Sequence, residues 1–198
     1  MAQREPATEG SDFGRILAFT DGVFAIAITL LVLGFDDPSG PDVARRVLDQ
    51  WPQLLAYLLS FAVVGRMWLV HHRFFATLHR FDRLLLVLNL AYLAAVVLVP
   101  YTSELLGDHG GETVAAVLYA VVLAIATLLQ WAMVRHTLRA KHVRDELRAR
   151  VAPFGGPRAL FAPALLLVSI PVAFANPHVA EVMWIMLVVP ALPRARET

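Results

Sequence analysis

FGRILAFTDGVFAIAITLLVLGF, residues 13–35, is an apolar run in which only Arg15 and Asp21 carry charge. A transmembrane helix needs roughly 20 mainly apolar residues to cross about 30 Å of hydrocarbon. The run is long enough, and a carboxylate inside it is costly in lipid unless it has a structural or functional role. Residues 13–35 therefore predict a membrane-spanning helix whose carboxylate has a structural or functional role.

Five further apolar runs follow the first one along the chain. We expect six spans, at residues 13–35, 54–70, 84–100, 114–134, 160–175 and 179–192. The last two are short, and the pair Asn176-Pro177 predicts the turn of a helical hairpin between them. The fold class expected is an all-α integral membrane protein, with residues 1–198 forming a single domain.

The composition agrees with a chain that lies mostly in lipid. Hydrophobic residues make up 58% and charged residues 17%, with a mean hydropathy of +0.63. A soluble domain has about 45–50% apolar and about 25% charged residues. The absence of cysteine excludes disulfides, thiolate metal sites and a cysteine nucleophile. A net charge of +1 argues against nucleic acid as a partner of the whole chain.

Basic residues concentrate in alternate loops, which predicts the orientation in the membrane. The richest stretch is residues 135–158, and the other basic positions on that side are Arg4, Arg15, Arg73, Arg80, Arg83, Arg194 and Arg196. The loops between them hold only Arg45 and Arg46. By the positive-inside rule both termini are cytoplasmic, in a multi-pass protein of the cell membrane. The stretch 135–158 is then interpreted as a cytoplasmic loop beside anionic lipid.

Several polar side chains of the first three spans fall at a similar depth. Asp21 lies six residues inside Arg15, about 9 Å deeper in a helix. Asn89 and Arg66 lie equally deep inside the basic ends of their own spans, and His71 and His72 lie about one turn shallower. With the indole donor of Trp68, these groups are expected to meet in one buried network. The spacing leaves open which of the two histidines takes part.

The first helix has distinct faces at 100° per residue. An apolar stripe follows the i, i+4, i+7 pattern, with a threonine beside it: Ile26, Leu30, Leu33 and Thr29. Asp21 points about 140° away from Ile26, so the carboxylate and the stripe serve different surfaces. A third strip consists of small residues suited to close helix contact: Ala18, Gly22 and Ala25.

These motifs resemble a known family. The pattern R-x-x-x-F-T-D, formed by Arg15, Phe19, Thr20 and Asp21, is similar to the opening of the first helix in the transmembrane protein 175 family. Thr20 stands where that family usually has serine. Trp68 followed by His71 and His72 resembles the family's W-x-x-H-H pattern, and Asn89 in the third span fits as well. The family consists of endolysosomal potassium channels with shorter bacterial homologues.

The resemblance implies a six-helix subunit, a homotetramer, and a pore surrounded by the first helices. It also implies a constriction of apolar side chains at Ile26, with Leu30 and Leu33 further along and Thr29 in a layer that coordinates cations. The sequence agrees in having no TVGYG-like segment, and so no carbonyl filter of that type. We therefore expect a modestly potassium-selective channel in which an apolar ring resists wetting, with K⁺ as the permeant ion and membrane lipid as its surroundings.

Two further expectations concern the ends of the pore helix. The Asp21 network would fix the packing of the first helix against the second and third, a structural role that we favour over gating or proton sensing. Asp37 falls near the helical face of Ile26 at the outer end. It is expected to raise the cation concentration at the external mouth of the pore.

Other classes of function find little support. The chain has no P-loop, no G-x-S-x-G and no H-E-x-x-H motif, so an enzyme is not expected. His71, His72 and His79 are the candidate metal ligands, but the adjacent His71 and His72 diverge by 100° and no carboxylate lies three or four residues from the pair. Neither a metal nor any other cofactor is therefore expected.

One transport alternative remains open, a proton-coupled secondary transporter that uses Asp21 with His71 or His72 as a proton relay. The chain shows no inverted repeat and no matched pair of broken helices, which such transporters often have. A structural membrane protein without transport is the third class.

Overall fold

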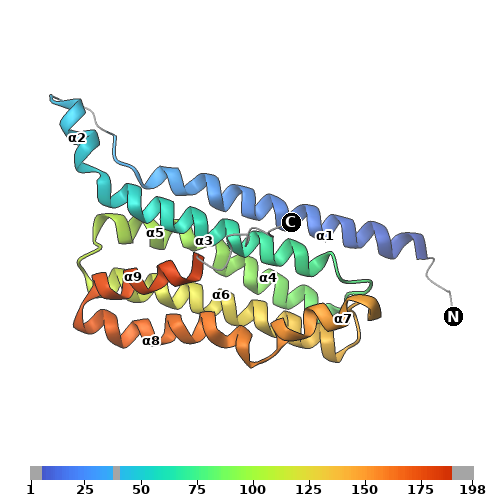
Figure 1. Cartoon of the computed structure of the whole chain (residues 1–198). Coiled ribbons are helices and arrows are strands. Elements are labelled where there is room, and N and C mark those ends of the chain that lie inside the picture. The colour runs from blue at the N-terminus through green and yellow to red at the C-terminus, as the bar shows by residue number, and fades with distance from the viewer. Residues whose placement is uncertain (1–5, 38–40, 189–198) are drawn as a thin grey trace, which may run out of the picture.

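Helices account for nearly all of the computed structural model, which describes residues 6–37 and 41–188 (Figure 1). The α-helices are α1 Pro6–Leu30, α2 Val43–Asp49, α3 Trp51–Phe75, α4 Arg83–Val97, α5 Val99–Asp108, α6 Thr113–Arg139, α7 Asp145–Val151, α8 Phe161–Ala175 and α9 Pro177–Val188. Short 3₁₀ turns follow at η1 Leu31–Gly34, η2 Ala152–Gly155 and η3 Pro157–Leu160. The all-α membrane fold expected from the sequence is confirmed.

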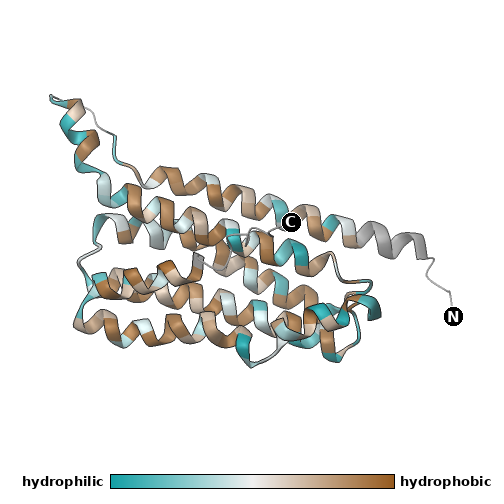
Figure 2. Cartoon of the chain, in the orientation of Figure 1, coloured by the Kyte–Doolittle hydropathy of each residue, from teal (hydrophilic) through white to brown (hydrophobic). Residues whose placement is uncertain are grey.

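Five helical stretches of the described chain are long and apolar enough to cross a bilayer. They are Phe13–Gly34, Trp51–Phe75, Arg83–Asp108, Thr113–Arg139 and Pro157–Ala175. The sixth expected span, 179–192, coincides with α9 up to Val188. Residues 189–192 of that span, and the basic residues Arg4, Arg194 and Arg196, lie outside the described residues. Many large apolar side chains of the long helices are exposed, as expected for a protein in lipid. Hydrophobic residues run along most of the length of these helices (Figure 2).

The third span is longer than the sequence predicts. The expected end was Pro100, yet the helical path continues through a break at Leu98 into α5 and ends at Asp108. Proline has no N–H to donate, and the first residues of a helix need none. Pro100 lies in the first turn of α5, so it opens a new helical segment instead of ending the span.

The expected hairpin between the last two helices is present. α8 ends at Ala175 and α9 begins at Pro177, with Asn176 as the only residue between them. The side-chain Oδ1 of Asn176 accepts a hydrogen bond from the backbone N–H of His178 at 3.0 Å. Across the hairpin, the buried indole of Trp184 donates to Ser169 Oγ at 2.9 Å. The turn chemistry and this cross-link hold the two helices together.

The basic stretch 135–158 is more ordered than the loop that we expected there. α6 extends to Arg139, and α7 forms within the stretch. Acidic residues in the first turn of α7 and arginines in its last turn complement the helix dipole. An isolated bridge between Leu78 and Val143 ties this stretch to the linker that joins α3 and α4.

The position of α1 decides which of its faces the bundle covers. α1 lies along one side of the bundle against α3 and α4 (Figure 1). Its inner face buries residues at i, i+4, i+7 and i+11, namely Thr20, Phe24, Ala27 and Leu31. Because only this face is covered by the chain, the rest of α1 is open to lipid or to another protein.

Candidate functional site

The outer face of α1 carries the apolar stripe identified in the sequence. Ile26 is 59% exposed and Leu33 is 69% exposed, and Leu30 is exposed between them. Thr29 lies beside the stripe, and its hydroxyl donates to the backbone carbonyl of Ile26 at 2.9 Å. This bond uses the hydroxyl proton and leaves both lone pairs of the oxygen available as acceptors. The four side chains thus form one surface that points away from the bundle.

The small residues of α1 lie on the same open side. Ala18, Gly22 and Ala25 are exposed, and a Cβ added to Gly22 would meet no atom of the described chain within 4 Å. The close helix contact that small residues permit is therefore not made within one subunit. The strip is available for contact with a second chain.

Asp21 points in the other direction, as the helical angle predicts. Its Oδ1 accepts a hydrogen bond from the indole N–H of Trp68 on α3 at 2.8 Å. A hydrogen bond to an ionised acceptor is among the stronger kinds in proteins. This contact joins α1 to α3 on the side away from the stripe.

A second polar contact joins the same helices deeper in the bundle. His71 Nε2 lies 2.8 Å from Asn89 Oδ1, and Asn89 Nδ2 donates to Thr20 Oγ1 at 3.0 Å. All three side chains are buried. The His71 ring stacks on Phe75, with ring centroids 4.1 Å apart, and packs against Tyr92 at 5.4 Å. One residue each from α1, α3 and α4 is thereby linked in a single chain of hydrogen bonds.

The structure resolves the choice that spacing left open between the two histidines. His71 is buried and bonded to Asn89, whereas His72 is exposed and lies against Trp68 with ring centroids 5.4 Å apart. Arg15 and Phe19, the first two residues of the sequence motif, are exposed on α1.

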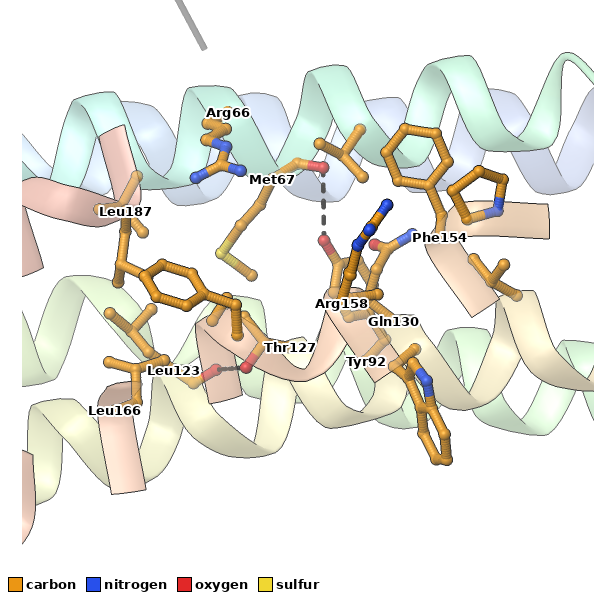
Figure 3. A pocket seen from close by; sticks show the side chains of 18 residues that line it. Arg66, Met67, Tyr92, Leu123, Thr127, Gln130, Phe154, Arg158, Leu166 and Leu187 are labelled. Atoms are coloured by element: carbon orange, nitrogen blue, oxygen red, sulfur yellow. Dashed lines mark hydrogen bonds between the residues drawn. The ribbon is translucent and has the colours of Figure 1, made fainter. Parts of the chain in front are cut away.

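Arg66 does not join the Asp21 network, contrary to expectation. It lies two residues before Trp68, which places it about 200° around α3 and therefore on another face. There it lines a cavity between α3 and α6 (Figure 3). The sequence places Arg66 at a similar depth to Asp21 along its span, but depth alone does not fix the direction in which a side chain points.

Asp37 follows η1 and is exposed in the segment that leads toward α2. α2 and α7 lie at opposite ends of the bundle (Figure 1). Asp37 is therefore at the end opposite to the basic residues of α7, where the sequence analysis expected an external mouth.

A cluster that sequence reasoning missed lies near α7. Asp82 caps the start of α4, since its Oδ1 accepts from the Leu85 N–H at 2.8 Å. Its Oδ2 lies 2.8 Å from His136 Nε2 and 3.9 Å from His142 Nε2. Donor atoms of these three side chains lie within 4.8 Å of one another, which is close enough for one divalent cation. Because hydrogen bonds already occupy Asp82, we assign the cluster to packing of α4 against α6.

Comparisons with known proteins match the same region. A family model described as the endosomal/lysosomal potassium channel TMEM175 matches residues 15–100, which include Asp21, Trp68, His71 and Asn89. The chain is 41% identical over 142 residues to a potassium channel of Streptomyces collinus, covering 68% of this chain and 69% of that protein.

Two further matches come from one organism. A potassium channel of Chamaesiphon minutus is 38% identical over 184 residues, covering 86% of this chain and 88% of that protein. A crystal structure of a lysosomal potassium-selective channel TMEM175 homolog from Chamaesiphon minutus superposes with a TM-score of 0.80 at 32% identity. That superposition covers 90% of this chain and 95% of the other.

Proposed function

The chain belongs to the TMEM175 family of ion channels, and on this premise we propose that it is a potassium-permeable channel of the cell membrane. The observation that carries the proposal is the outward direction of Ile26 and Leu30 on α1 and of Leu33 on η1, opposite to the hydrogen bonds of Asp21 and Thr20. Both the family and the absence of catalytic motifs argue against an enzyme.

The pore is built from the outer faces of several copies of α1. A ring of branched apolar side chains at Ile26 narrows the path and resists wetting. Ions that hold water tightly, such as sodium, are penalised more at such a ring than potassium is. Thr29, one turn after Ile26, supplies hydroxyl oxygens to a cation next to the ring. The result is modest potassium selectivity without a carbonyl filter or any bound cofactor.

The assembly that this pore needs is a homotetramer. The small side chains of Ala18, Gly22 and Ala25 let neighbouring subunits approach α1 closely, which is how small residues promote helix association in lipid. Asp37 then lies at the external end of four helices, and its four carboxylates attract cations to the mouth.

The alternative of a proton-coupled transporter is less well supported. A relay between Asp21 and His71 would need the two groups to exchange protons. In the described chain Asp21 bonds to Trp68, whereas His71 bonds to Asn89 among aromatic rings. Neither bond leads from one group to the other.

The orientation proposed has both termini in the cytoplasm, as the basic loops indicate. The natural chain has no cysteine, so single cysteines can be introduced on a clean background. A membrane-impermeant maleimide should label cysteines at positions 41 and 109 in intact cells, and position 150 only after permeabilisation. External labelling at position 150 would contradict this orientation.

The channel proposal is tested by recording from the purified protein in planar bilayers with K⁺ as the main cation. Discrete unitary currents with a reversal potential that favours K⁺ over Na⁺ are expected. Coupled flux without unitary currents would instead indicate a transporter, and neither activity would indicate a structural protein.

A further inference from the structure

A cavity of about 340 Å³ lies on the side of the bundle away from the pore helix (Figure 3). Its walls come from α3, α4, α6, the η2–η3 segment, α8 and α9, and no α1 residue lines it. The volume is at the lower end of the roughly 300–1,000 Å³ typical of small-molecule sites. The pore proposal assigns no role to this cavity.

Two arginines reach the cavity from different elements. Arg66 comes from α3, in the middle of a membrane span, and Arg158 comes from η3, where the chain enters the span Pro157–Ala175. Among the described residues neither guanidinium has an acidic partner within 4 Å. A cationic side chain inside a membrane protein is costly unless it is paired. Arg66 is half-buried and Arg158 is exposed, and two unpaired guanidinium groups around one cavity favour an anion as the occupant.

Neutral polar atoms in the same wall also lack partners, and two of them, Gln130 Nε2 and Trp131 Nε1, are donors. In the described part of the chain, neither Oε1 nor Nε2 of Gln130 makes a hydrogen bond, although both atoms are shielded from solvent. Trp131 Nε1 is enclosed and unpaired in the same way. Gln130 points into the space beside Arg158 (Figure 3). Buried polar groups usually have partners, so these donors indicate that a ligand with acceptor oxygens completes the site.

The rest of the cavity is apolar. Met67, Leu123, Leu166 and Leu187 form its far wall. The aromatic side chains of Phe154 and Phe161 line the cavity and are also exposed at the surface of the bundle. A free inorganic anion would leave this apolar surface uncovered. A molecule with a charged head and a hydrocarbon tail would fill both parts.

We propose that this cavity binds an anionic phospholipid, with its phosphate between Arg66 and Arg158 and part of an acyl chain against the leucines. Arginine matches phosphate geometry with two parallel hydrogen bonds. Arg158 lies at the start of the span Pro157–Ala175, on the side that the basic residues assign to the cytoplasm. Basic pockets between helices on the cytoplasmic side are a recurrent mode of lipid headgroup recognition.

The test uses the full chain in a neutral detergent, with lipid binding measured by native mass spectrometry. Phosphatidylglycerol should bind with a defined stoichiometry of one per subunit, and zwitterionic phosphatidylcholine should bind much more weakly. Arg158→Gln should weaken phosphatidylglycerol binding by about tenfold or more, since it removes charge-assisted hydrogen bonds. Arg66→Gln repeats the test on the opposite wall.

Arg150→Gln is the matched control, because Arg150 is an exposed arginine of α7 that does not line the cavity. It should leave phosphatidylglycerol affinity within about twofold of the natural chain. If Arg150→Gln and Arg158→Gln lost phosphatidylglycerol affinity equally, the proposal would be contradicted. The loss would then follow from the change in net charge and not from the cavity. Binding of inorganic phosphate without binding of phosphatidylglycerol would also contradict it.

A second measurement locates the lipid. Phosphatidylglycerol brominated on its acyl chains should quench tryptophan fluorescence, and Trp131→Phe should remove a large part of that quenching because Trp131 lines the cavity. Quenching that is unchanged by Trp131→Phe would place the lipid elsewhere. Neither measurement depends on ion conduction, so the lipid site and the channel function can fail independently.

Discussion

Trp68 donates its indole N–H to Asp21 at 2.8 Å, and this bond joins the only acidic side chain within the first span to α3. The bond and the outward stripe lie on different faces of one helix. We therefore infer that the Asp21 carboxylate affects the stripe only by orienting α1, and that it does not contact a passing ion.

Substitutions at Asp21 should therefore change stability and leave selectivity intact. The partner is a neutral indole, not the cationic Arg66 or histidine that spacing suggested, so Asp21→Asn keeps an acceptor oxygen and should cost little. Asp21→Ala removes the acceptor and should cost about 0.5–2 kcal/mol, seen as a lower Tm of the detergent-solubilised protein. An Asp21→Ala channel that assembles normally but has lost preference for K⁺ would place Asp21 in the ion path.

Thr20 and Asn89 should be energetically coupled. Asn89→Leu leaves His71 Nε2 without its partner and also removes the bond to Thr20. In a double-mutant cycle with Thr20→Val, the coupling free energy of unfolding should be about 0.6 kcal/mol, the usual size in a membrane bundle. Asn89→Leu with Thr127→Val is the control, because Thr127 bonds only to carbonyls of its own helix. A coupling no larger than that of the control would contradict the bond.

Acid should weaken the end of the bundle near α7. Burial lowers the pKa of His142 below its ordinary 6.5, despite the opposing attraction of Asp82. Because the unfolded chain then binds more protons at this site, stability falls as the pH drops below about 6.5. The Tm, measured from about pH 8 to about pH 5, should decline over the acid half of this range.

His142→Phe should reduce this decline, and His109→Gln, at an exposed histidine that follows α5, is the control that should not. Asp82 acts in the same direction at lower pH. Burial opposes its ionisation, yet the Leu85 amide and His136 hold its pKa below the ordinary 3.8. Its contribution to stability is therefore present above that pH and lost as the pH falls further. A Tm that rises between about pH 8 and about pH 5 would contradict the His142 assignment, and a Tm that rises below about pH 4 would contradict the Asp82 assignment.

Asp37 should affect current mainly at low ionic strength. In the proposed tetramer, four Asp37 carboxylates at the external mouth raise the local cation concentration, and salt screens this effect over about 10 Å at 0.1 M. Asp37→Asn should reduce inward current in dilute solution and have little effect in concentrated salt. Asp49→Asn is the control, because Asp49 is an exposed acid on α2 that lies 4.0 Å from Arg45. If Asp37→Asn and Asp49→Asn reduced the inward current equally, the special role of Asp37 at the mouth would be contradicted.

The existence of the helices could be predicted because apolar runs of sufficient length have few alternatives in a membrane. The turn at Asn176 was predictable for a local reason, since Asn-Pro pairs favour turns. The continuation past Pro100 was missed, because a proline that ends one helix and one that begins the next look alike in sequence. Span ends are therefore less predictable than the spans themselves.

The candidate site was predictable where helical geometry decides it. The angle between Asp21 and Ile26 follows from 100° per residue, and the structure places the two side chains accordingly. The cluster of Asp82, His136 and His142 was not predictable, because its members come from distant parts of the chain and follow no fixed spacing. The direction of Arg66 was missed although helical geometry gives it, because two residues before Trp68 is about 200° around α3.

The measurement that tests the pore assignment most directly is a comparison of single-channel currents from Ile26→Asn and Ile125→Asn. Both isoleucines are exposed, but Ile26 lies on α1 and Ile125 on α6. With Ile26 at the narrowest ring, Ile26→Asn should wet the constriction, raise conductance and reduce discrimination between K⁺ and Na⁺. Ile125→Asn should leave both properties unchanged. If Ile26→Asn had the same conductance and selectivity as the natural chain, the assignment would be contradicted and the stripe would lie against lipid or protein.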